Sequence, residues 1–266
     1  MSRGVPTGAG VLARLIAIGA LSLSSVTSAF SSFGGRGSPA HTGASARSAD
    51  LATKPRVGCP DNLADRLAST GRASQLVTAE ASGPGRSLAT VELWQRSGRC
   101  WFEVARPWPA LIGENGFSAH HREGDGTTPT GFYSLGRTVY GNQPNPGYRG
   151  PYHRLVCGDW WDEDPTSPAY NTFRHLPCGQ APPFGGDSEP LWQETAFYPS
   201  FIVVEYNVNP VVPYAGSAIF VHPSTGSPTT GCVSVPRADL DQLLRWLVPS
   251  AAPAIAMAPA DELARL

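Results

Sequence analysis

The chain has 266 residues, of which 41% are hydrophobic and 15% charged, with a formal net charge of −1. This length accommodates one large domain or two small ones, each able to bury its own core. The balance of 20 basic and 21 acidic residues lacks the basic footprint that a phosphate backbone requires, so we expect no nucleic-acid partner. Twenty-nine glycines and 26 prolines disfavour long helices and predict a mainly β protein. Lys54 is the only lysine, which excludes lysine bases, Schiff bases and P-loop lysines from the folded region.

The first 29 residues have the order of a secretory signal peptide. Arg3 and Arg14 precede an apolar run over residues 15–23, and small residues follow it up to Ala29. This run is shorter than the roughly 18 to 20 residues that a membrane span needs. We therefore expect cleavage after Ala29 and no membrane span in the mature protein, with an uncleaved anchor as the alternative.

Two further segments follow the predicted signal peptide. Residues 30–58 are rich in Ser, Gly, Ala and Arg and contain few large apolar side chains, so they predict a disordered tether. No linker interrupts the rest of the chain, and residues 59–266 are expected to form a single domain.

Export implies an oxidising compartment, in which cysteines pair. The chain contains Cys59, Cys100, Cys157, Cys178 and Cys232, and none of them belongs to the C-x-x-C pair of a thioredoxin motif or zinc ribbon. The simplest arrangement joins Cys59 to Cys100 and Cys157 to Cys178, and the second bridge is worth about 3 kcal/mol. Cys232 is left over, and an odd thiol in an exported protein forms an intermolecular link, lies inert in the core or is reactive.

Hydrophobic patterns predict the regular elements in chain order. Strands are expected at residues 75–81, 88–95, 100–105, 201–206, 217–222 and 254–258. Residues 123–133 predict a glycine-punctuated turn that runs into a short strand. A helix is expected where Leu240, Leu243, Leu244 and Leu247 repeat at helical spacing after Pro236. Residues 141–190 leave no room for a regular element of normal length, and we expect a long loop pinned by a disulfide.

The segment from His222 to Cys232 carries the chemistry. His222 ends a predicted strand, and Cys232 follows after a loop of Ser, Thr, Gly and Pro. An imidazole close to a thiol takes its proton, and the resulting thiolate is a nucleophile. Gly231 lets the backbone approach a substrate closely and present N–H groups to an oxyanion. The small polar neighbours of Cys232 favour a reactive thiol over an inert one.

With these residues the sequence resembles the L,D-transpeptidases of the YkuD (ErfK/YbiS/YcfS/YnhG) type, which crosslink bacterial peptidoglycan. The resemblance rests on His222, on Thr-x-Gly-Cys at residues 229–232, and on Arg-Glu-Gly-Asp-Gly-x-Thr-Pro-x-Gly at residues 122–131. Two further segments, residues 161–171 and 206–207, are similar to a less-studied branch of this family.

The resemblance implies a β-sandwich or mixed-sheet catalytic domain with one C-terminal helix and a long disulfide-pinned loop. It implies that Cys232 is the nucleophile and His222 its general base. The carbonyl of Pro223 then orients the imidazole, and Gly231 and Cys232 supply N–H donors to the oxyanion.

Two positions depart from the better-known members, which carry Ser-His-Gly-Cys. Thr230 stands where those members have a second histidine, and Ser234 stands where they have an arginine or asparagine. The candidate substrate-binding residues are therefore Arg122, Thr230, Ser234 and Arg237.

The implied reaction is a ping-pong acyl transfer on peptidoglycan stem peptides that needs no cofactor. Cys232 attacks the carbonyl of the third residue of a stem tetrapeptide, releases D-alanine and forms a thioester, which an amine of a neighbouring stem resolves into a 3→3 crosslink. If water resolves the thioester, the same site is an L,D-carboxypeptidase. We expect a monomer that is secreted, to the cell wall or periplasm of a bacterium.

Two rival functions use other residues. A metal hydrolase would take zinc ligands from His120, His121, Asp125, His153 and His175, but neither H-E-x-x-H nor H-x-H is present, and we expect no metal. A non-catalytic cell-wall binding module would use the aromatic side chains of Trp160, Trp161 and Tyr170 as an exposed platform.

Overall fold

The computed structural model describes residues 58–266. The predicted signal peptide and the predicted tether up to residue 57 lie outside the described residues. Within the described part of the chain, the helices are too short and too polar to cross a membrane.

The described chain is mainly β, as predicted from its composition. Its strands are β1 (Gln75–Ala81), β2 (Leu88–Ser97), β3 (Cys100–Glu103), β4 (Trp108–Leu111), β5 (Phe117–Ser118), β6 (Thr128–Pro129), β7 (Gly131–Gly141), β8 (Tyr152–Arg154), β9 (Asp159–Asp162), β10 (Thr172–His175), β11 (Glu189–Pro190), β12 (Phe201–Val204), β13 (Phe220–Pro223), β14 (Val233–Val235) and β15 (Ala254–Pro259). The helices are α1 (Leu63–Arg66), α2 (Arg237–Trp246) and α3 (Ala260–Leu263), with the 3₁₀ turn η1 (Pro249–Ala251).

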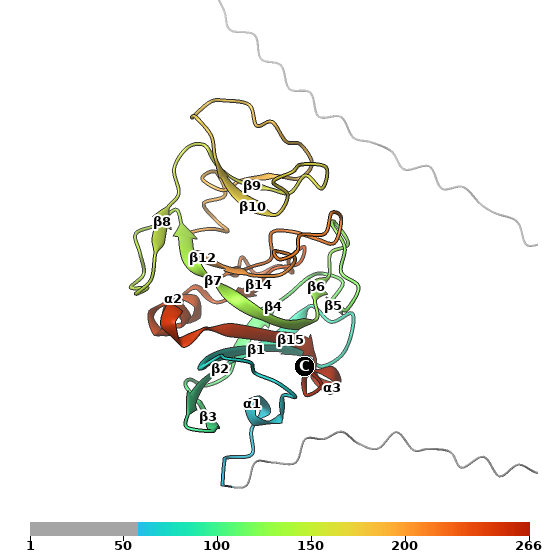
Figure 1. The fold of residues 1–266 in the computed structure, drawn as a ribbon, viewed down its shortest axis with the longest axis vertical. Coiled ribbons are helices and arrows are strands. Elements are labelled where there is room, and N and C mark those ends of the chain that lie inside the picture. The colour runs from blue at the N-terminus through green and yellow to red at the C-terminus, as the bar shows by residue number, and fades with distance from the viewer. Residues whose placement is uncertain (1–57) are drawn as a thin grey trace, which may run out of the picture. The chain divides into compact units, whose positions relative to one another are not determined.

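The largest sheet closes on itself. Its ten strands follow the order β1-β15-β7-β12-β13-β14-β4-β2-β3, with β8 on β7, and β1 also pairs with β2. The pairs β1–β15, β13–β14 and β7–β8 are parallel and the others antiparallel, so the sheet is mixed. The mixed-sheet architecture implied by the sequence is confirmed, and its curvature encloses one central core (Figure 1).

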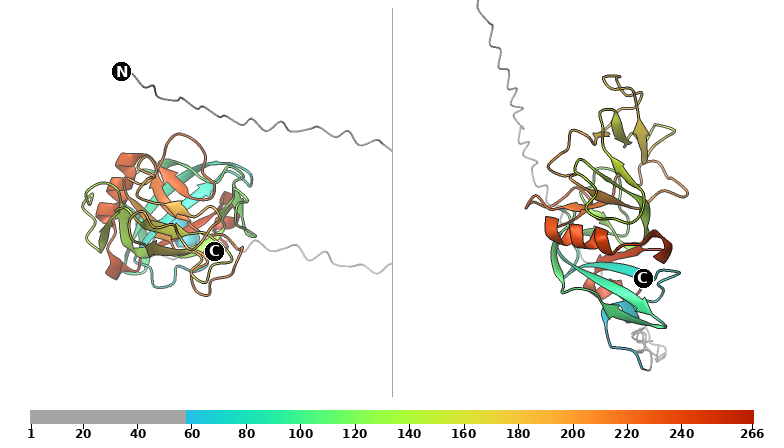
Figure 2. Two further views of the ribbon diagram at one scale, coloured as in Figure 1. Left: turned by 90° about the horizontal axis from the view of Figure 1, so that it is seen from above. Right: turned by 90° about the vertical axis from the view of Figure 1, so that its left-hand side faces the viewer.

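Side chains alternate across the strands of this sheet, so each strand serves two cores. On β12, Ile202 and Val204 point into the central core, whereas Phe201 and Val203 point outward into a second cluster that also contains Cys232. The buried leucines of α2 pack into the central core, as their helical spacing predicted. Figure 2 shows the helix itself beside the sheet. The predicted nucleophile therefore lies on the outer face of β12 and β13.

The chain between β7 and β12, residues 142–200, covers this outer face and is called the excursion below. Its colour runs from yellow-green to gold, and its strands β9 and β10 lie at the end of the domain opposite to α1 and β3 (Figure 1). Its strands β9, β10 and β11 form a separate three-stranded sheet of two to four residues per strand, which agrees with the expectation that no element of normal length fits there. The disulfide Cys157–Cys178, with 5.2 Å between its Cα atoms, ties the base of β9 to the end of β10.

A third cluster lies on the opposite side of the central core. It packs α1 and α3 against the outer face of β1 and β15 around Trp94 and Trp101. The disulfide Cys59–Cys100 joins the start of the described chain to β3 in this region. Both disulfides are those of the simplest pairing, and Cys232 is a free thiol.

Several predicted elements differ from the structure at their ends. The strand predicted at residues 217–222 begins only at Phe220, because Ala218 adopts a left-handed φ of 52° that a strand does not accommodate. The strand predicted at 201–206 ends at Val204, where the register with β7 shifts. The predicted short strand after the glycine turn is the 11-residue β7. Strand β14 was not predicted, because its three residues are too few for a pattern.

Candidate active site

The parallel pair β13–β14 brings His222 and Cys232 to one face of the sheet. Val221 pairs with Val233, and both side chains point into the central core. Phe220, His222 and Cys232 stand one residue away from this pair, so their side chains point to the opposite face, under the excursion. Cys232 immediately precedes β14, and the fold brings it level with the start of β13 although ten residues separate it from His222.

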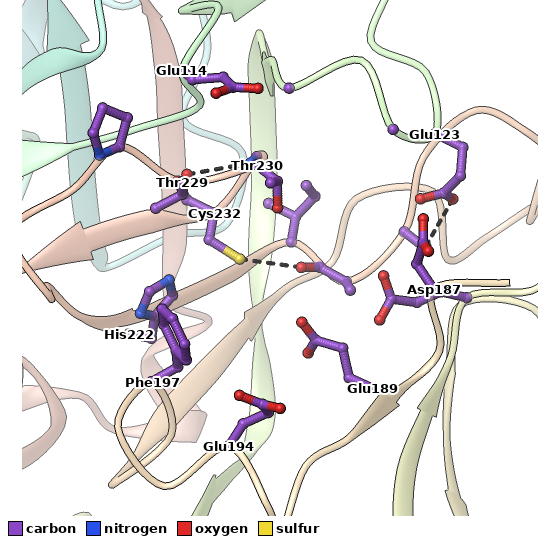
Figure 3. A pocket seen from close by; sticks show the side chains of 18 of the residues that line it. Glu114, Glu123, Asp187, Glu189, Glu194, Phe197, His222, Thr229, Thr230 and Cys232 are labelled. Carbon is purple, nitrogen blue, oxygen red and sulfur yellow. Dashed lines mark hydrogen bonds between the residues drawn. The ribbon is translucent and has the colours of Figure 1, made fainter. Parts of the chain in front are cut away.

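Two backbone groups hold the sulfur of Cys232. The N–H of Phe220 donates to Sγ at 3.3 Å, and the thiol donates to the carbonyl oxygen of Ala218 at 3.2 Å (Figure 3). Ala218 is itself held by the excursion, because its N–H donates to Oδ1 of Asn171 at 3.1 Å. The side chain of Cys232 is therefore fixed in place, and the residue is only 9% exposed.

The imidazole of His222 has one nitrogen engaged and one nitrogen free for proton transfer. Its Nδ1 lies 2.8 Å from the carbonyl oxygen of Pro223, so the proton resides on Nδ1 and Nε2 is the basic nitrogen. The rings of Phe197 and Tyr198 meet His222 edge to face, with centroids 6.3 and 5.9 Å away. The backbone and two aromatic rings thus fix both the tautomer and the orientation of the base.

Burial favours the neutral forms of both His222 and Cys232. Burial lowers the pKa of His222 to about 4, although the bond to Pro223 opposes this shift. Burial also raises the pKa of the Cys232 thiol well above its usual range, and the nearby charge of Glu189 raises it further. Among the described residues, no hydrogen bond joins the thiol to His222. Proton transfer from sulfur to imidazole is therefore expected to accompany attack on a substrate rather than to precede it.

The two motifs that flank the site contact each other directly. The hydroxyl of Thr128, in the glycine-rich turn, donates to the carbonyl oxygen of Gly231 at 2.8 Å. A Cβ atom at Gly231 would lie 3.0 Å from Cδ1 of Ile219 and 3.1 Å from the carbonyl oxygen of Thr127, so a larger residue would press these neighbours apart by a few tenths of an ångström. Asp125 shapes the turn by accepting the N–H groups of Arg122 and Thr127, both at 2.8 Å.

A cavity of about 510 Å³ opens beside Cys232. The loop before β14 and the side chain of His222 form one wall, and the excursion and the glycine-rich turn form the other (Figure 3). None of the residues that line the cavity is an arginine or lysine. Six of them carry carboxylates: Glu114, Glu123, Glu163, Asp187, Glu189 and Glu194. His121 also lines the cavity, and burial lowers its pKa. The lining therefore holds many more carboxyl groups than basic side chains.

Four of these carboxylates, Glu123, Glu163, Asp187 and Glu189, are called the acidic wall below. Glu189 accepts a hydrogen bond from the hydroxyl of Tyr198 at 2.5 Å, and Glu123 accepts one from Ser217 at 2.8 Å. Glu163 is 9% exposed, and its Oε1 has no hydrogen-bond partner among the described residues. Burial raises the pKa of Glu189 to about 7, and burial followed by the charge of Glu189 raises the pKa of Glu163 well above its usual value.

Three of the four predicted substrate-binding residues do not reach the cavity, and only Thr230 lines it. Arg122 is exposed at the glycine-rich turn and is not among the lining residues. Arg237 begins α2 and pairs with Asp241 at 3.1 Å. Ser234 is buried, and its hydroxyl donates to the carbonyl oxygen of Leu111 at 3.3 Å. Arg122, Ser234 and Arg237 thus lie outside this cavity, since β14 turns Ser234 away from it and carries Arg237 beyond it, and their role in substrate binding stays a prediction.

The N–H of Gly231 does not face the cavity freely. It donates to Oγ1 of Thr229 at 3.2 Å, and the same hydroxyl donates to the carbonyl oxygen of Cys232 at 2.6 Å. Both bonds of the Thr229 hydroxyl close the turn that presents Cys232; Thr229, Thr230 and Cys232 are labelled in Figure 3. The prediction that Gly231 serves as an oxyanion donor thus requires its N–H to exchange Thr229 for the substrate.

The residues considered as zinc ligands are divided between two places. His121 lies 3.1 Å from Asp125 beside the cavity. His153 and His175 both contact the buried carboxylate of Asp159 in the excursion, at 2.8 and 2.7 Å. In the part of the chain that is described, no three His, Cys, Asp or Glu side chains are arranged to hold a metal ion.

The aromatic platform of the rival binding module is wrong for two of its three residues. Trp161 is buried, donates to Asn171 at 3.0 Å and packs against Phe220. Tyr170 is also buried, and its hydroxyl contacts Glu123. Only Trp160 is half-buried, against Phe184 and Trp192. Both buried residues support the wall of the cavity and offer no exposed face to a sugar.

Sequence reasoning missed the acidic wall and Tyr198. Glu163 lies inside the Trp-Asp-Glu-Asp segment at residues 161–164, which was noted only for its resemblance. Glu189 and Tyr198 stand in irregular sequence with no motif, and only the folding of the excursion brings them beside Cys232.

Comparison with known proteins agrees with this geometry. No curated protein and no solved structure gives a significant match to the chain. A family model described as the YkuD L,D-transpeptidase catalytic domain matches residues 87–255, from β2 to β15, which is more than half of the chain. This span includes His222, Cys232 and the whole excursion. The chain therefore belongs to the YkuD family of L,D-transpeptidase catalytic domains.

Proposed function

We propose that this protein is an L,D-transpeptidase that forms 3→3 crosslinks between peptidoglycan stem peptides through a thioester on Cys232. One observation carries the proposal: the free thiol of Cys232, directly before β14, lines the same cavity as His222, whose Nδ1 is held by the carbonyl oxygen of Pro223. Membership of the YkuD family supports the class of reaction and of substrate.

The first half-reaction acylates Cys232. The sulfur attacks the carbonyl carbon of the third residue of a stem tetrapeptide, and the thiol proton passes to Nε2 of His222. The N–H of Cys232 supports the oxyanion. The bond from this carbonyl carbon to the nitrogen of D-alanine then breaks, His222 returns the proton to the departing nitrogen, and a thioester remains.

The second half-reaction releases the acyl group. An amine of a neighbouring stem gives a proton to His222 and attacks the thioester, and the departing sulfur recovers the proton as the new amide forms. If water takes the place of the amine, the product is a shortened stem and the protein is an L,D-carboxypeptidase.

We also propose that the protein acts outside the cytoplasm as a monomer, with residues 1–29 as a signal peptide, 30–58 as a tether and 59–266 as the catalytic domain. Two disulfides support export, because such bonds form and persist in oxidising compartments. The single closed sheet supports one domain from residue 59 onward.

Intact-mass spectrometry tests the chemistry. Incubation with a stem tetrapeptide is expected to add the mass of the peptide less D-alanine, and the adduct is expected to map to Cys232 and to be absent in Cys232→Ala. A stem tripeptide, which lacks the leaving group, is the control and is expected to add nothing. Release of D-alanine that persists in Cys232→Ala would contradict the proposal. When a stem amine is added, the ratio of crosslinked to shortened product shows whether the thioester is resolved mainly by the amine or mainly by water.

A further inference from the structure

The acidic wall is unexpected in a cavity that accepts peptides with free carboxylates. Stem peptides carry carboxylates, and an anion near several glutamates in a partly desolvated site is strongly disfavoured. Arginine and lysine are absent from the lining residues, and the two histidines that line the cavity have lowered pKa values and are neutral at pH 7. The lining therefore offers no permanent cation to balance the acidic wall.

Glu163 is the strongest sign that a ligand completes this wall. Its carboxyl group is buried to nine-tenths and lines the cavity, yet Oε1 has no hydrogen-bond partner among the described residues. Leaving a buried carboxyl oxygen without a hydrogen-bond partner costs its desolvation free energy, so such groups are normally paired. The other members of the acidic wall are also carboxylates, which accept hydrogen bonds and, when ionised, donate none. Glu189 and Glu123 already accept hydroxyl groups, and neither supplies a donor to Oε1 of Glu163.

A primary ammonium group satisfies these requirements. It has a positive charge and three N–H donors, so it can bond to Oε1 of Glu163 and to a second carboxylate together. Glu189 and Asp187 lie on the same side of the cavity as Glu123, across from Cys232 (Figure 3). A substrate bound to this wall therefore extends an ammonium group toward the excursion while its carbonyl faces the sulfur.

We propose that the acidic wall, with Glu163 at its centre, is a binding site for a primary ammonium group of the substrate, free of a neighbouring carboxylate. The inference rests on the proposed acyl transfer at Cys232 and specifies the substrate of that site. The ammonium group has two possible sources in such a reaction, the side chain of the third residue of the acyl donor and the incoming acceptor amine. Both place the same chemistry on the same carboxylates.

Binding without chemistry provides the first test. Three stem tetrapeptides are compared by calorimetry on Cys232→Ala, with lysine, Nε-acetyl-lysine or diaminopimelate as third residue. The lysine stem is expected to bind at least tenfold more tightly than the acetylated stem, which has the same length without the charge, and the diaminopimelate stem is expected to bind less tightly than the lysine stem. Glu163→Gln on the same background is expected to reduce the lysine preference to less than threefold. Glu103→Gln, on an exposed carboxylate of β3, is the matched control and is expected to preserve it.

The acceptor is tested on the acyl-enzyme. Wild-type protein acylated with the acetyl-lysine stem is offered a lysine stem, and the ratio of amide to hydrolysed product is measured. A ratio that falls at least fivefold in Glu163→Gln, with no lysine preference in the donor titration, assigns the wall to the acceptor amine. Equal binding of the lysine and acetylated stems, together with an unchanged product ratio, overturns the ammonium site and leaves the proposed acyl transfer intact. Ammonium-dependent binding with no thioester from any donor supports the site and overturns the proposed function instead.

Discussion

The two walls of the cavity are built by different means. The wall that carries His222 and Cys232 belongs to β13 and the segment leading into β14, inside a closed sheet with side chains packed on both faces. The acidic wall belongs mainly to the excursion, whose strands are two to four residues long and whose shape depends on a disulfide and side-chain bonds. The reacting groups thus stand on a sheet that is packed on both faces, whereas most of the groups proposed to select the substrate stand on connecting segments, which tolerate change more readily.

Asn171 links the two walls. Its Oδ1 accepts the indole N–H of Trp161 at 3.0 Å and the N–H of Ala218 at 3.1 Å. Its Nδ2 donates to the carbonyl oxygens of Tyr206 and Asn207, at 3.0 and 2.9 Å. The carbonyl of Ala218 in turn accepts the thiol of Cys232. A single buried amide thus connects the excursion to the backbone that holds the nucleophile.

The largest expected effect on activity comes from a substitution in the wall that carries His222 and Cys232. His222→Gln removes the base, and kcat/KM for release of D-alanine is expected to fall by about 10²–10⁴. Because the pKa of His222 is lowered to about 4, the free enzyme keeps the basic imidazole above that pH, and the acid limb of kcat/KM is expected near pH 4 rather than near pH 6.5. A stopped assay of D-alanine from pH 3 to 8 measures both. Retention of more than a tenth of the activity in His222→Gln would remove His222 from the mechanism.

Loss of one disulfide is expected to act on the acidic wall alone. Replacing Cys157 and Cys178 by serine removes the bridge that closes the excursion, which is expected to cost about 3 kcal/mol of unfolding free energy and to raise KM for stem peptides. Replacing Cys59 and Cys100 is the matched control, because that bridge closes a longer loop on the far side of the sheet. The control is expected to lose about as much stability with KM unchanged. Denaturant unfolding and steady-state kinetics on both variants decide the matter, and equal changes in KM would contradict the division into two walls.

Ionisation of Glu189 is expected to lower the free energy of unfolding as the pH rises toward and above 7. Its pKa is raised to about 7, so the folded state binds more protons than the unfolded state between pH 4.5 and 7, and stability falls as pH rises through 7. The groups that face it are Glu194, Glu163, Tyr198 and Cys232. Glu189→Gln is therefore expected to gain on the order of 2 kcal/mol over the wild type at pH 8 and nothing below pH 4.5.

Urea unfolding of both proteins at pH 4.3, 6 and 8 measures this difference. The exposed Glu103→Gln is the control and is expected to follow the wild type at all three values. A gain that is the same at every pH would show that the effect of Glu189→Gln comes from packing and not from ionisation.

The smallest effect is expected at Arg237. This side chain is exposed and pairs with Asp241 on α2, away from both walls, so Arg237→Ala is expected to change stability by less than about 0.5 kcal/mol and to leave kcat/KM within twofold. Thermal unfolding and the D-alanine assay check this. A tenfold rise in KM would restore Arg237 as a substrate ligand and would show that the substrate reaches beyond the cavity.

The sequence alone predicted the mainly β class, the strands over β1, β2 and β15, and the helix α2. It also predicted that His222 and Cys232 lie close together. These features depend on local pattern, since alternation, leucine spacing and the loop between His222 and Cys232 are visible within short windows. The free state of Cys232 followed from counting five cysteines, because two short loops accounted for the other four.

The tertiary structure decided what no short window contains. Closure of the sheet through the β1–β2 pair, the inward turn of Ser234 and the displacement of Arg237 depend on how strands far apart in the chain are paired. The gathering of Glu123, Glu163 and Glu189 around one cavity depends on the folding of the excursion, where sequence carries no periodicity. Carboxylates that are unremarkable in a chain of 20 basic and 21 acidic residues thus meet only because the fold places them around one cavity.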